Sequence, residues 1–194
     1  MDIYPIEPAQ AWRVAPREPI SAIGLLSPSG FDAVARLPAF AAYGDYSDWL
    51  DAREGVRMSL AFAGVDVEFT PVSLTAMVAW SRLAGGPIDE TELDRLAAFA
   101  LAVRRAPRPA ALAALTEDDF EAAEVRLGGA KSFAAWLQRR RNRRAELAAA
   151  GFVVFDVTVR LDDFVAWRRC VGLLVSEASL DAYAALTLEL LAAE

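Results

Sequence analysis

Apolar and polar positions recur along this chain with an offset of 87 residues. The stretches 60–101 and 147–188 align without a gap, and eighteen of the 42 aligned positions are identical. The identities go beyond the matches that an alanine-rich composition produces by itself, and they include Gly64/Gly151, Trp80/Trp167, Arg82/Arg169, Gly85/Gly172, Glu90/Glu177 and Asp94/Asp181. A pattern of this kind indicates that one supersecondary unit occurs twice.

The repeat extends beyond this aligned stretch, with small gaps. The segment 15–17 (Ala-Pro-Arg) returns as 106–108, and Trp49-Leu50 returns as Trp136-Leu137. We therefore divide the chain into an N-terminal extension (1–14), a first repeat unit (15–105) and a second repeat unit (106–194), with both units expected to form one domain. Within the extension, the run Ala11–Val14 is a candidate added strand.

Each unit is expected to form four helices, because the predicted starts carry capping residues in both copies. The matched caps are Ser27/Thr116, Asp45/Ser132 and Asp89/Ser176. The predicted helices span 28–37, 46–63, 74–84 and 90–104 in the first unit, and 117–127, 133–150, 161–171 and 177–192 in the second. The four matched glycines end two of these helices in each unit, at the position where a chain turns left-handed.

One strand is predicted in each unit, at 65–72 and 152–159, where valine and phenylalanine are frequent. A lone buried strand leaves its backbone amides and carbonyls unpaired, which is costly. We therefore expect the two strands to pair with each other across an internal pseudo-twofold axis. The predicted fold class is α-rich α+β, with two tandem repeats of about 87 residues, each ordered helix, helix, strand, helix, helix, around a minor sheet.

The composition excludes several kinds of chemistry. The 194 residues include no histidine, which removes Ser-His and Cys-His nucleophile pairs and nearly all zinc sites. No cofactor or metal is expected. The single cysteine, Cys170, cannot form an internal disulfide and favours a reducing compartment, so we expect a cytoplasmic protein. No apolar run reaches the roughly 18 residues of a membrane span, so no membrane partner is expected.

The strongest charge signal is the run Arg139-Arg-Arg-Asn-Arg-Arg144 on the predicted helix 133–150. Arg140 and Arg144 match Arg53 and Arg57 of the first unit, and such matched positions are typical of structural salt bridges. Arg139, Arg141 and Arg143 occur only in the second unit. The first unit has Ala52, Glu54 and Val56 at these places.

We interpret Arg139, Arg141 and Arg143 as a partner-binding face. Because the chain carries a net charge of −7, the expected partner is a protein with an acidic surface. Nucleic acid, bound through the helix 139–144, is the alternative.

Six matched charges form a second constellation: Arg82, Glu90 and Asp94 in the first unit, and Arg169, Glu177 and Asp181 in the second. We interpret the acids as first-turn residues that favour the helix dipole and pair with the arginine that ends the preceding helix. A further alternative places Asp94 and Asp181 in a shared cleft as the acid and base of an enzyme. The sequence favours a non-catalytic protein-binding or scaffold module over either alternative.

Overall fold

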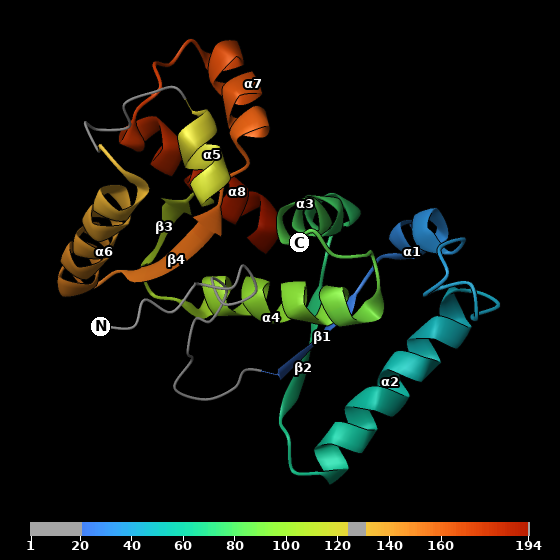
Figure 1. The fold of residues 1–194 in the computed structure, drawn as a ribbon. Helices are drawn as coiled ribbons and strands as arrows, with labels where there is room; N and C mark the ends of the chain where they lie inside the picture. Colours follow the sequence, from blue (N-terminus) through green and yellow to red (C-terminus); the bar gives the residue numbers. More distant parts are fainter. Residues whose placement is uncertain (1–20, 124–130, 194) are drawn as a thin grey trace. The chain divides into compact units, whose positions relative to one another are not determined.

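The computed structural model describes residues 21–123 and 131–193, which form eight helices and four strands (Figure 1). The fold is rich in helix, with a minor component of two small sheets. The described residues divide into two compact units, one formed by 21–105 together with 190–193 and the other by the described residues of 106–189. The candidate strand Ala11–Val14 and the end of the helix predicted at 117–127 lie outside the described residues.

The first unit contains two strands and four helices. In chain order these are β1 (Ser21–Leu25), α1 (Pro28–Val34), α2 (Tyr46–Phe62), β2 (Val67–Pro71), α3 (Leu74–Ala84) and α4 (Glu90–Arg105).

The second unit has the same order of elements. They are β3 (Pro109–Ala114), α5 (Glu117–Ala122), α6 (Phe133–Ala149), β4 (Val153–Thr158), α7 (Leu161–Val171) and α8 (Glu177–Ala192).

The predicted helix starts are confirmed at the atomic level. The Ser27 hydroxyl accepts from the amide of Gly30 at 3.1 Å, and Asp45, Thr116 and Ser132 cap α2, α5 and α6 in the same way. The matched glycines after the helices have left-handed backbones, with φ of 78° at Gly64 and 84° at Gly151.

The predicted sheet is wrong. The strands β2 and β4 do not pair with each other. Instead β1 pairs with β2, and β3 pairs with β4, each in parallel register. Each unit is therefore ordered strand, helix, helix, strand, helix, helix, and β2 and β4 each pair with a strand of their own unit. The strands β1 and β3 have no clear sequence signal, because Ser21–Leu25 and Pro109–Ala114 contain mostly small residues with low strand propensity.

Aromatic side chains form the part of each core that surrounds the longest helix. In the first unit Trp49 is fully buried and stacks on Phe31, with ring centroids 5.4 Å apart. In the second unit Trp136 is fully buried and stacks on Phe133 at 5.7 Å. Burying a large apolar side chain contributes roughly 1.5–3 kcal/mol. These two tryptophans therefore anchor α2 and α6, whose remaining residues are mostly exposed.

Candidate functional site

A buried arginine joins three elements of the first unit. Arg53 extends from α2 and is 3 % exposed. Its guanidinium pairs with the carboxylate of Asp94 on α4 and lies 3.5 Å from the carbonyl oxygen of Gly24 in β1. The amide of Gly24 in turn donates to Asp94 Oδ1 at 2.8 Å. The Arg53–Asp94 pair thus satisfies both backbone groups of one strand residue.

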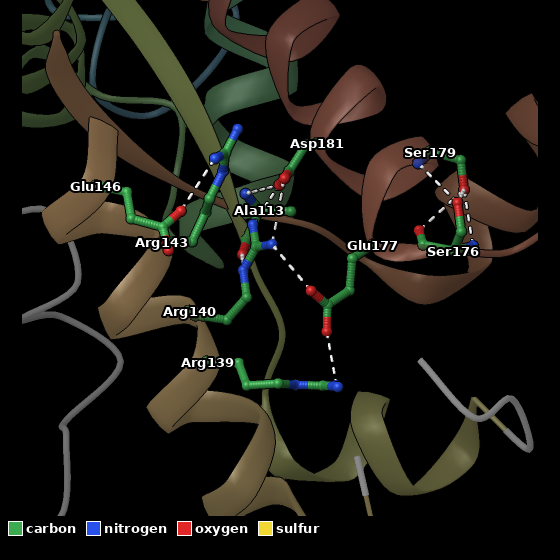
Figure 2. A network of polar contacts seen from close by, with 9 residues as sticks. All are labelled: Ala113, Arg139, Arg140, Arg143, Glu146, Ser176, Glu177, Ser179 and Asp181. Carbon is green, nitrogen blue, oxygen red and sulfur yellow. Dashed lines mark hydrogen bonds and ion pairs between the residues drawn. The ribbon is translucent and has the colours of Figure 1, made fainter. Parts of the chain in front are cut away.

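The second unit contains the same arrangement (Figure 2). Arg140 extends from α6 and is 6 % exposed. Its guanidinium pairs with Asp181 on α8, and its Nε donates to the carbonyl oxygen of Ala113 in β3 at 3.1 Å. The amide of Ala113 donates to Asp181 Oδ1 at 3.0 Å.

The matched acids therefore lie beside a different arginine from the expected one, which was the arginine at the end of the preceding helix. Glu90 lies 3.8 Å from Arg53, and Glu177 lies 3.9 Å from Arg140, measured between the nearest charged atoms. Arg82 and Arg169 are exposed on the last turns of α3 and α7. Within the part of the chain that the structure describes, neither of them forms an ion pair with these acids.

The spacing of four residues between tryptophan and arginine explains why α2 and α6 present these side chains together. Residues i and i+4 lie on one face of a helix. Among the 17 described residues of α2, only Trp49 and Arg53 are buried, and in α6 only Trp136 and Arg140 are. The fully buried part of each helix therefore consists of one aromatic and one charged side chain.

Burial raises the pKa of Asp94 above its ordinary value, and the Gly24 amide and the Arg53 guanidinium oppose that shift. Asp94 and Asp181 belong to different units, and each is bound to an arginine and a backbone amide of its own unit. In this arrangement both carboxylates position a helix against a strand.

The two networks differ at the glutamate. In the first unit Glu90 accepts hydrogen bonds from the indole Nε1 of Trp49 at 2.9 Å and from the hydroxyl of Tyr43 at 3.2 Å. Burial and this carboxylate raise the pKa of Tyr43.

In the second unit Glu177 forms an ion pair with Arg139 instead, at 2.7 Å between Oε1 and Nη2, although Oε1 accepts no hydrogen bond among the described residues. The indole Nε1 of Trp136 then has no hydrogen-bond acceptor among the described residues, although the ring is fully buried. The two units differ in sequence at this contact, because Arg139 stands at the position of Ala52, whose methyl group cannot form an ion pair with the glutamate.

An open groove of about 450 Å³ lies between α6 and α8 in the second unit. Figure 2 shows its charged side chains reaching toward one another from the two helices. Three arginines and three carboxylates line it, so their formal charges cancel. The lining residues are Arg139, Arg140, Asn142, Arg143, Glu146, Glu177, Ala178 and Asp181.

The arginine run is more neutralised than its sequence suggests. Arg143 pairs with Glu146 at 3.1 Å, and Arg144 pairs with Asp156 of β4. Arg141 is exposed, and no ion pair involves it within residues 21–123 and 131–193. The three arginines proposed to bind a partner are therefore in different states: Arg139 and Arg143 hold carboxylates, and Arg141 extends into solvent.

Residues 21–123 and 131–193 contain no cluster of three or more cysteine, aspartate or glutamate side chains arranged to hold a metal ion. Within the same residues, no helix is both long enough and apolar enough to cross a membrane. Comparisons of the chain with known protein families, with curated protein sequences and with solved structures found no match.

Proposed function

We propose that this chain is a non-catalytic, cytoplasmic protein-binding module. Its partner, a protein with an acidic surface, contacts the exposed face of α6 and the groove between α6 and α8. We further propose that 15–105 and 106–194 are copies of one unit related by an internal pseudo-twofold axis. In this proposal the first copy keeps the ancestral surface, and the second has acquired the binding face through Arg139, Arg141 and Arg143.

The groove between α6 and α8 is the observation that carries this function. Its arginines already hold carboxylates: Arg139 holds Glu177 and Arg143 holds Glu146. The side chains of Arg143 and Glu146 are 54 % and 65 % exposed, and an exposed pair of this kind contributes only about 0–1 kcal/mol. A partner carboxylate can therefore replace Glu146 at little cost. Arg141 does not line the groove, and it offers a second exposed cation on another face of α6.

Nucleic acid is the alternative partner. A nucleic-acid site needs a continuous cationic surface along the phosphate backbone. The equal numbers of arginines and carboxylates in the groove argue against such a surface. The enzyme alternative would need Asp94 and Asp181 to exchange protons with a substrate. Both are engaged by an arginine and a strand amide, which favours a structural role.

A charge-matched pair of variants tests the proposal. The test variant carries Arg139→Ala, Arg141→Glu and Arg143→Val, which are the residues of the first unit at these positions. The control carries Arg82→Glu and Arg169→Glu, which changes the net charge by the same amount at two exposed arginines that do not line the groove. Binding of a glutamate-rich peptide and of a single-stranded oligonucleotide is measured by fluorescence anisotropy over a salt series.

We expect the test variant to keep its circular dichroism spectrum and to lose peptide binding, while the control retains binding. An equal loss of peptide binding in both variants would mean that binding depends only on the net charge of the protein. Tighter binding of the oligonucleotide than of the peptide, with an affinity that falls linearly in a plot of log K against log salt, would favour nucleic acid.

A further inference from the structure

We infer that the groove between α6 and α8 is a carboxylate-binding site with an internal exchange of partners. A carboxylate of the bound protein takes Arg139 from Glu177, and Glu177 then accepts the indole N–H of Trp136. This inference rests on the proposed function. It adds that the guanidinium of Arg139 receives the partner's carboxylate and that the indole N–H of Trp136 gains an acceptor when this happens.

The first unit supplies the arrangement expected after the exchange. There, no arginine occupies the position of Arg139, since that residue is Ala52. The glutamate of that unit accepts from its tryptophan, with 2.9 Å between Trp49 Nε1 and Glu90 Oε1. The same residue types, at matched positions on α2 and α4, thus form the bond that the second unit lacks.

The unpaired indole provides a reason for the exchange. Trp136 is fully buried, and among the described residues its N–H has no acceptor. A buried donor without a partner is unfavourable. When Glu177 is released from Arg139 it stays close to a cation, because its Oε2 lies 3.9 Å from Arg140. The loss of one ion pair is therefore offset by a new hydrogen bond, and Glu177 keeps a countercharge.

The groove favours a carboxylate over a phosphate. Its arginines already bind the carboxylates of Glu146, Glu177 and Asp181, which remain in the lining when the partner arrives. A singly charged carboxylate of the partner adds one negative charge to the groove. A phosphate dianion would add a second negative charge next to the remaining acids, which repel it.

The experiment follows the five indole N–H resonances of the full chain labelled with ¹⁵N-tryptophan, assigned with single Trp→Phe variants. The probe is acetyl-Ala-Glu-Ala-Glu-Ala-amide, and the control peptide has glutamine in place of glutamate. Arg139→Ala gives the second unit the residue of the first and should release Glu177 without any peptide. Trp49 serves as the internal reference in every spectrum, because its bond to Glu90 lies in the other unit.

We expect the acidic peptide to move the Trp136 indole resonance downfield, toward the position of a hydrogen-bonded indole, and to leave Trp49 unchanged. In Arg139→Ala the Trp136 resonance should already be moved, and the peptide should bind about tenfold or more weakly, as expected for the loss of a charge-assisted contact. Glu177→Gln frees Arg139 and reduces the negative charge of the groove, so this variant should bind the peptide more tightly than the native chain.

Distinct results separate this inference from the proposed function. If the peptide binds, Arg141→Ala weakens it and Trp136 does not respond, the exchange is wrong and the protein-binding function stands. An unmoved Trp136 resonance in Arg139→Ala also overturns the exchange. If neither the acidic peptide nor its control binds the native chain at all, the proposed function fails together with this inference.

Discussion

A Cβ atom on Gly24 would lie 2.7 Å from the backbone oxygen of Leu93, so β1 and α4 approach each other more closely at this point than any side chain allows. We expect Gly24→Ala to destabilise the first unit by about 1–3 kcal/mol, because the obstacle is helix backbone and cannot move aside. Urea denaturation followed by circular dichroism measures the effect.

The equivalent residue of the second unit, Ala113, provides the control. Its side chain is accommodated and 2 % exposed. Ala113→Gly should cost only about 1 kcal/mol, through backbone entropy and the loss of one methyl group. Equal costs for the two substitutions would contradict the close approach of Gly24 and Leu93.

Thr70→Val should stabilise the protein. Thr70 in β2 is 1 % exposed, and among the described residues its hydroxyl has no hydrogen-bond partner. An unsatisfied buried hydroxyl costs about 1–3 kcal/mol, and valine removes it with little change in shape. The matched residue of the second unit is Val157, which is fully buried. Val157→Thr should lower the unfolding free energy by a similar amount, and a stabilising effect of that reverse change would contradict the explanation.

The Arg53–Asp94 pair should show strong coupling in a double-mutant cycle. The side chain of Arg53 is 4 % exposed and that of Asp94 is 33 % exposed. Asp94→Ala leaves a buried guanidinium and the Gly24 amide without their acceptor, and we expect a loss of about 3 kcal/mol. Arg53→Met should cost less, because water can hydrate the remaining carboxylate. The double variant should lose less than the sum of the single losses, whereas simple additivity would mean that the pair contributes no coupling energy.

Asp156 should make the unfolding free energy fall as pH rises through its titration. Burial raises the pKa of Asp156 above its ordinary value of 3.8, and the guanidinium of Arg144 opposes the shift. The folded protein therefore holds a proton at pH values where the unfolded chain has released it. The contribution of Asp156 to stability is present below pH 3.8 and declines as pH rises through the raised pKa.

Asp156→Asn removes this dependence. The unfolding free energy of the native chain minus that of the variant should decrease from pH 3.8 upward and level off above the raised pKa. Denaturation over a series of pH values measures the difference. An increase over the same range would mean that the ion pair with Arg144 outweighs burial.

Much of the helical framework could be predicted from the sequence. The caps at Asp45 and Ser132 and the left-handed glycines Gly64 and Gly151 are local signals, and each depends on a few neighbouring residues. Parallel pairing within each unit carries no such signal. The partners of β2 and β4 lie two helices earlier in the chain, in segments of mostly small residues.

The sequence predicts which acidic residues belong to the site, but it does not predict which arginine each of them pairs with. The sequence marks Asp94 and Asp181 as matched charges, and the neighbouring arginine on the preceding helix was the natural expectation from spacing. The actual partners, Arg53 and Arg140, follow a matched tryptophan by four residues, and that spacing was the available signal. Choosing between the two arginines requires knowing that β1 and β3 exist, since both contacts are completed by a strand backbone.

The backbone groups of Gly24 and Ala113 also determine whether a further strand can be added to either sheet. Alternate residues of a strand direct their amide and carbonyl groups to opposite sides. Leu25 and Ala114 direct their carbonyl oxygens to the partner strand, so Gly24 and Ala113 direct theirs away from it. A third strand, or a strand of another molecule, would bond there. Aspartate supplies the acceptor and arginine the donor that such a strand would bring. Each Arg–Asp pair therefore occupies the backbone groups through which a further strand would join the sheet. Loss of either pair would leave an open edge, the feature through which β-proteins associate and aggregate.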